Sequence, residues 1–211
     1  MKKSLARIAK LALIVCLLNG AAFADFREHF DLGQNYLANY QYSGAITEFR
    51  SALRINYLDN SARIGLINAY LARAAEYGNR DNNWAKAADD FRSALFYMVY
   101  YPTSTQVQNS ASAINQATKN LEICLKATNF DFSPENRFNY AKKLRAEGNF
   151  SAAAYEFNQA LGSKNLQKNS FEQVGDIMKL LWNEPKASDY YKKRSVRVNV
   201  HARAHRNVRV H

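Results

Sequence analysis

The chain has 211 residues, 47% of them hydrophobic, and a formal net charge of +11. Eight glycines and three prolines leave little material for a loop-rich β fold, and the hydrophobic content is sufficient for a buried core. The positive charge lies at the two ends, because the first ten residues carry four basic side chains and residues 192–211 carry seven without any acid. Residues 25–191 sum to zero, so charge disfavours a nucleic-acid-binding surface on the body of the chain.

Residues 1–24 have the pattern of a bacterial secretory signal peptide. A basic start precedes the apolar residues 11–18, and Ala-Phe-Ala at residues 22–24 supplies the small residues required for cleavage after Ala24. The apolar run is shorter than the roughly 20 residues that span a bilayer. An uncleaved anchor is the weaker alternative, and the bulky Val15 disfavours lipidation of Cys16. We expect an exported protein that is periplasmic or secreted and has no transmembrane helix when mature.

One nine-residue pattern occurs three times, at residues 45–53, 87–95 and 153–161. Each copy has alanine, phenylalanine and alanine at its first, fifth and eighth positions, namely Ala45, Phe49 and Ala52; Ala87, Phe91 and Ala94; and Ala153, Phe157 and Ala160. These positions lie along one stripe of a helix, where small residues allow a neighbouring helix to approach and the phenylalanine fills the gap. The pattern predicts stacked helical units, and an ordinary helical bundle with accidental self-similarity is the alternative.

A second helix precedes each stripe, with Tyr36 or Leu144 nine residues before the first alanine in the outer copies. In the first copy, Leu32, Gly33, Tyr36, Ala45, Phe49 and Ala52 match the signature positions of the tetratricopeptide repeat, so residues 26–59 resemble one 34-residue repeat. His29 and Tyr57 depart from its Trp and Pro. The resemblance implies an all-α fold in which antiparallel helix pairs form a right-handed superhelical stack over residues 25–191.

In the first two units, we expect a turn near residues 39–44, a second helix ending near Ile55 and a helix cap at residues 60–61. The second unit is eight residues longer between its helices, which places an insertion at residues 77–84. We interpret it as an enlarged turn whose Trp84 folds back on the second helix, with a contact loop as the alternative. The aromatic residues 96–101 that follow are expected to pack internally or to form a binding patch.

In the second half, residues 104–128 indicate one long helix or a degenerate fourth pair. Ser133 and Pro134 form a strong helix start and open the third unit. Residues 170–173 resemble a capping box, and the helix after them, through about Trp182, would cap the array. A last short helical segment is expected from Pro185.

No catalytic or metal-binding motif occurs in the chain, so we expect neither enzymatic activity nor a cofactor. His29 is expected to be a packing residue, and Cys124, the only cysteine left after signal cleavage, a buried and inert thiol. A hydrolase that acts on envelope material stays open as a weaker class.

Repeat arrays of this family hold peptides or partner helices against the first helix of each pair. Carried onto this chain, the resemblance implies a partner-binding groove formed by Arg27, Phe30, Gln34, Ile64, Asn68, Leu71, Phe138, Lys142 and Arg145. The expected function is a non-catalytic protein-interaction module of the bacterial envelope. The alternative is a structural subunit of an envelope or secretion assembly, docked through the aromatic patch near residues 97–101 and the insertion.

From Ser195 the sequence alternates apolar and polar residues, a period typical of a strand, while carrying strong like charge. We expect residues 192–211 to be disordered when free and to contact an anionic envelope surface or an acidic partner through Arg194, Arg197, Arg203, Arg206 and Arg209. An incidental terminus without function is the competing interpretation.

Overall fold

A computed structural model of the chain describes residues 23–100 and 111–181. These residues are helical apart from short turns and contain no strand, which confirms the all-α prediction for this part of the chain. The described residues group into two compact units, one up to Ala69 and one from Tyr70, so the boundary lies inside α3 (Asn60–Asn79). These two units are distinct from the three repeats of the sequence. Within the described ranges, no helix is both long and apolar enough to span a membrane. The signal cleavage site and the basic tail lie at or beyond the edges of these ranges.

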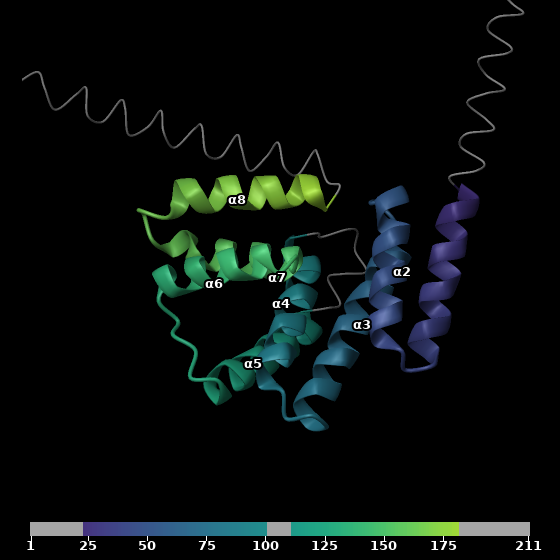
Figure 1. Ribbon diagram of the computed structural model, residues 1–211, viewed down its shortest axis with the longest axis horizontal. Coiled ribbons are helices and arrows are strands. Elements are labelled where there is room, and N and C mark those ends of the chain that lie inside the picture. Colours follow the sequence, from purple (N-terminus) through teal and green to yellow (C-terminus); the bar gives the residue numbers. More distant parts are fainter. Residues whose placement is uncertain (1–22, 101–110, 182–211) are drawn as a thin grey trace, which may run out of the picture. The chain divides into compact units, whose positions relative to one another are not determined.

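The first unit packs α2 (Tyr42–Ile55) between a helix over residues 23–38 and the start of α3 (Figure 1). Phe49 of α2 is fully buried and fits between two glycines. A Cβ atom on Gly33 would lie 2.8 Å from the Phe49 ring, and one on Gly65 would lie 2.4 Å from it. The close approach of the three helices therefore depends on the missing side chains at Gly33 and Gly65.

The second unit contains the remaining helices, namely the end of α3, α4 (Trp84–Tyr100), α5 (Ala111–Ala127), α6 (Pro134–Ala146), α7 (Phe150–Gln159), η2 (Ala160–Gly162) and α8 (Gln167–Leu180). Its packing centres on α4 and α7, which contact each other. On their other sides, α4 packs against α5, and α7 packs against both α6 and α8. Figure 1 shows α8 alongside α7. Phe96, Phe157 and Ile177 are among the fully buried side chains of this core.

The predicted alanine–phenylalanine stripes face the interior in all three copies. Every alanine of the stripes is fully buried, as are Phe49 and Phe157, and Phe91 is 5% exposed. The burial confirms that the repeated pattern is a packing stripe.

The turns after three helices share one backbone geometry. Tyr40, Asn129 and Gly148 have positive φ angles of 60°, 52° and 77°. At each of these turns, the backbone N–H of the next residue donates to the carbonyl five residues before it. Gln41 donates to Tyr36 at 2.8 Å, and Asn149 donates to Leu144 at 2.9 Å. Because Gly148 stands where Tyr40 stands in the first copy, the turn recurs together with the stripe.

The insertion in the second sequence repeat lengthens a helix. We expected an enlarged turn at residues 77–84, but α3 continues to Asn79 and α4 begins at Trp84, so the connection is only residues 80–83. Trp84 packs against Gly78 of α3. A Cβ atom added at Gly78 would lie 3.2 Å from the Trp84 ring. The extra residues thus extend the first helix of the pair by about two turns.

Two helix starts differ from the prediction and one agrees with it. Asp59 caps α3 in place of residues 60–61, since its carboxylate accepts a hydrogen bond from the Ala62 N–H at 2.7 Å. The prediction of a capping box at residues 170–173 is wrong, because α8 begins at Gln167 and Ser170 is buried inside this helix. Ser133 does cap α6, accepting from the Asn136 N–H at 3.3 Å with Pro134 at the first helical position.

Candidate functional site

The candidate groove residues of the first unit are partly exposed and partly packed. Arg27, Gln34 and Asn68 are exposed, and Ile64 is 44% exposed. Phe30 is half-buried and lies 6.0 Å from the Phe49 ring. In this unit the expected polar positions therefore face solvent, while the phenylalanine packs against the stripe.

The candidates of the second unit divide in the same way. Phe138 is half-buried, 5.2 Å from the Phe157 ring. Lys142 is exposed. Arg145 donates a hydrogen bond to Gln173 and lies 3.8 Å from the carboxylate of Asp176, both on α8. Arg145 thus holds α8, and Lys142 is the exposed cation of the two. The five tail arginines, Arg194, Arg197, Arg203, Arg206 and Arg209, lie outside the described residues.

An acid–base pair between helices recurs in all three copies and was not foreseen. The residue before each stripe phenylalanine is acidic: Glu48, Asp90 and Glu156. Glu48 lies 2.7 Å from Nδ1 of His29, Asp90 takes two hydrogen bonds from Arg73 at 2.7 and 2.8 Å, and Glu156 pairs with Arg137 at 2.7 Å. Each partner lies on the preceding helix of its pair, so one contact between an acidic and a basic side chain accompanies each packing stripe. His29 and Arg137 occupy equivalent positions in the first and third copies, whereas Arg73 lies further along its helix.

The third of these pairs belongs to a larger buried cluster. Arg92 of α4 is 1% exposed and donates to Glu156 at 2.5 Å and to Asp89 at 2.9 Å. Tyr140 of α6 also donates to Asp89, at 3.0 Å. The guanidinium of Arg92 lies 4.7 Å from the centre of the Tyr140 ring. The cluster joins α4, α6 and α7 through charge-assisted hydrogen bonds around Arg92 and Glu156, whose side chains are 1% and 0% exposed.

Burial changes the acid–base chemistry of this region. It raises the pKa of the Asp89 and Asp90 carboxyls above their ordinary values, although Arg92 and Arg73, respectively, act in the opposite direction. Burial, together with the charge of Glu156, also raises the pKa of Tyr155 to about 12.

The raised pKa of Tyr155 predicts a loss of stability at alkaline pH. Between about pH 10 and 12, the unfolded chain releases this proton and the folded chain keeps it, so the free energy of unfolding falls as pH rises. In Tyr155→Phe, we expect the free energy of unfolding to decrease by about 2 kcal/mol less than in the unmodified protein over this pH range. Urea unfolding of both proteins at pH 8, 10 and 11.5 measures it, and parallel losses in the two proteins would contradict the assignment.

A cavity of ≈ 270 Å³ lies between α3, α4 and α5 of the second unit. One wall is the helical extension of α3, contributed by Ala74, Ala75, Gly78 and Asn79. The cavity reaches the surface, because Ala75 is exposed and Ile123 is 56% exposed.

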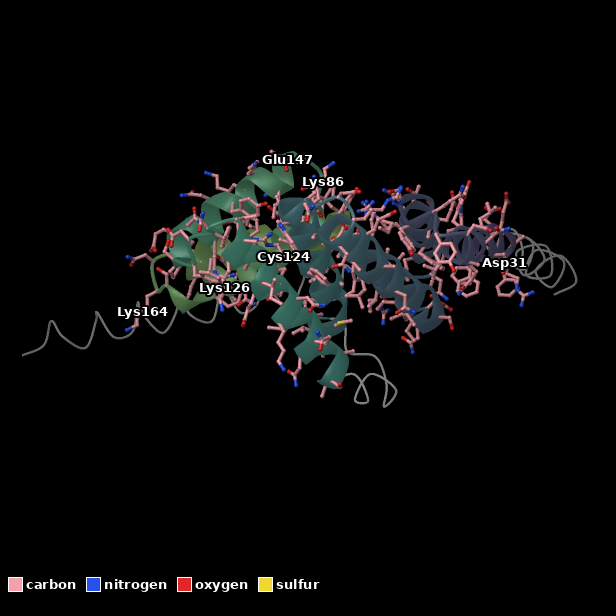
Figure 2. The ribbon with its side chains drawn as sticks, turned by 90° about the horizontal axis from the view of Figure 1, so that it is seen from below. Asp31, Lys86, Cys124, Lys126, Glu147 and Lys164 are labelled. Carbon is pink, nitrogen blue, oxygen red and sulfur yellow. The ribbon has the colours of Figure 1, made fainter. Side chains whose placement is uncertain are left out.

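The other walls are mainly aromatic and apolar. Trp84 and Phe91 come from α4, and Asn120, Ile123 and Cys124 from α5. None of the lining residues is charged. Figure 2 shows Cys124 among the helices, whereas Lys164 projects outward from the second unit. The walls therefore suit an uncharged group, with the amides of Asn79 and Asn120 as its hydrogen-bonding partners.

The remaining sequence candidates are packing residues. Cys124 is 2% exposed, as expected, and burial raises the pKa of its thiol. His29 is 38% exposed at its side chain and pairs with Glu48. Phe96, Tyr97 and Met98 of the expected aromatic patch are buried, Val99 is 43% exposed, and the Tyr100 side chain and Tyr101 lie outside the described residues. Among the described residues, no group of three or more His, Cys, Asp or Glu side chains is placed to hold a metal ion.

Over residues 23–100 and 111–181, the fold is all-helical, and one packing stripe recurs three times with an acidic residue that contacts a basic side chain of the preceding helix. No protein-family model matches the sequence, and no curated protein matches it.

Proposed function

We propose that the chain is a tetratricopeptide-like repeat protein that works as a non-catalytic interaction module, binding a partner peptide or helix along the first helices of its pairs. In this proposal the pairs continue one another as a right-handed superhelical stack, with α8 as its capping helix. The observation that carries it is the recurrence of the same buried stripe, with an acidic residue before each phenylalanine at residues 48, 90 and 156 that contacts a basic side chain of the preceding helix. Rigid repeated scaffolds of this kind typically present extended binding surfaces.

The proposed setting is the bacterial envelope. The pattern of residues 1–24 supports export, and the basic residues 192–211 would add an electrostatic contact with an anionic surface or acidic partner. We prefer peptide binding to the role of a docking subunit because Phe96 and Tyr97 are buried and unavailable for docking.

Lys142 provides the test of this function. Its exposed ammonium is suited to pair with a carboxylate of a bound peptide, and it can be changed without disturbing the contacts of Arg145 with α8. We expect peptides selected from a random library with free C-termini to bind the protein with micromolar Kd. Lys142→Glu should weaken binding at least tenfold, measured by calorimetry, because it replaces attraction by repulsion.

The matched control is Lys164→Glu, which makes the same charge change at an exposed position in the loop before α8. It should leave the Kd within about twofold. Failure to select any peptide, or equal losses from the two lysine variants, would contradict the proposed function.

A further inference from the structure

We infer that the cavity between α3, α4 and α5 is a socket for one large uncharged side chain of the partner peptide. The inference rests on the proposed function and names the anchor that the partner would supply. It begins with the extension of α3, because Ala74, Ala75, Gly78 and Asn79 all lie beyond the point where the first helix of the first pair ends.

Small residues on this extension create the space. Ala74, Ala75 and Gly78 carry at most a methyl group, and Trp84 stands opposite Gly78 at the start of α4. A leucine or phenylalanine at any of these three α3 positions would occupy the cavity. The eight extra residues therefore add a concave feature that the shorter first helices of the other two pairs cannot form.

Size and chemistry identify the occupant. A cavity of ≈ 270 Å³ exceeds the roughly 150 Å³ that holds benzene and falls below the roughly 300 Å³ at which pockets for drug-sized ligands begin. It therefore matches a single aromatic or large aliphatic side chain. Trp84 and Phe91 provide flat apolar walls, and the absence of any charged lining residue disfavours an ionised group, which would lose its hydration without gaining a partner.

The two carboxamides favour a peptide over a free hydrocarbon. Asn79 lies at the end of α3 and Asn120 on α5, so they line the cavity from different helices. A carboxamide offers both a donor and an acceptor, which matches the N–H and C=O groups on either side of a peptide side chain. Asn79 is exposed, and Asn120 is half-buried with its Oδ1 already accepting from Gln116 Nε2 at 3.0 Å, so the Asn79 carboxamide and the Asn120 amide N–H groups remain within reach of a main chain crossing the opening.

Trp84 and Cys124 report on the socket directly, since both line it. The test uses the full chain with Trp182→Phe, so that Trp84 is the only tryptophan. The probe is N-acetyl-phenylalanine amide, with N-acetyl-glycine amide and toluene as comparisons. We expect saturable quenching or enhancement of Trp84 fluorescence with a Kd of about a millimolar, and at least fivefold slower alkylation of Cys124, read by peptide mass.

Ala75→Phe fills the socket from an exposed helical position without adding a tryptophan and should abolish both signals. Ala146→Phe, the same change at the exposed end of α6, should leave them unchanged. Equal protection by the glycine amide, or probe binding to Ala75→Phe, would overturn the inference. If toluene protects Cys124 from alkylation as strongly as the phenylalanine amide does, the occupant of the socket is a free small molecule and not a peptide side chain. If protection of Cys124 increases with protein concentration alone, the occupant is a second copy of this chain.

The outcome also separates this inference from the function beneath it. If selected peptides bind Ala75→Phe normally but fail to bind Lys142→Glu, the socket is wrong and the interaction function stands. If no peptide is selected while the phenylalanine amide still binds at Trp84, the peptide-binding function is wrong and a side-chain-sized site remains.

Discussion

Gly65→Ala is expected to destabilise the first unit by about 1–3 kcal/mol. Helix propensity alone predicts the opposite sign, because alanine in a helix interior is favoured over glycine by about 1 kcal/mol. The packing decides the outcome: the added methyl group would lie 2.4 Å from the Phe49 ring, which is fully buried and cannot move aside without displacing α2. Urea unfolding followed by circular dichroism gives the change in free energy.

Gly162→Ala is the matched control for this substitution. Gly162 lies in η2 with no atom within 4 Å of an added Cβ, so alanine there should be neutral or slightly stabilising. Combining Gly65→Ala with Phe49→Leu should recover part of the loss, since the smaller side chain makes room. Stabilisation by Gly65→Ala would show that α3 does not approach Phe49 as described.

The second large effect is expected at the buried ion cluster. Glu156→Gln should destabilise the protein by about 3–5 kcal/mol, because it removes the negative charge that faces both Arg92 and Arg137. Glu156 is fully buried and Arg92 is 1% exposed, so water cannot replace the lost partner. The Nη2 group of Arg92 already has no hydrogen-bond partner among the described residues, which leaves the guanidinium little alternative.

Glu147→Gln makes the same chemical change in an exposed pair. Glu147 lies 3.9 Å from Lys143, and both side chains are more than half exposed, so we expect a loss of at most about 0.5 kcal/mol. The double replacement Arg92→Met with Glu156→Leu should recover part of the stability lost by Glu156→Gln, because it removes the two most buried charges, whereas Arg137 and Asp89 lose a partner but are 15% and 22% exposed. Similar losses from Glu156→Gln and Glu147→Gln would contradict the buried cluster.

Local sequence patterns predicted the local structure well. The Ala-Phe-Ala spacing identified buried stripes because helical periodicity fixes which residues share a face. The cap at Ser133 was found because a serine followed by proline satisfies the helix start within a few residues. The same reasoning failed at Ser170, where the spacing fits a capping box but the chain is already helical from Gln167 and the serine faces the core.

The features that depend on distant residues were not foreseen. Arg92 and Glu156 are 64 positions apart, and no periodicity relates them. A partial signal was present, because an acidic residue precedes the phenylalanine in each copy. The helical extension of α3 was missed because Gly78 and the asparagines after it are typical of turns, whereas in the folded chain Gly78 is the residue that admits Trp84. The cavity, formed by three helices together, follows from that packing and could not be read from any one of them.

The most direct measurement is a crystal structure of the protein with its tightest selected peptide. The proposed function and the socket together predict peptide density beside Lys142 and along the first helices of the pairs, with one aromatic or large aliphatic side chain between Trp84 and Ile123. A peptide bound only to other surfaces, with the first helices bare and the cavity unchanged, would contradict the account.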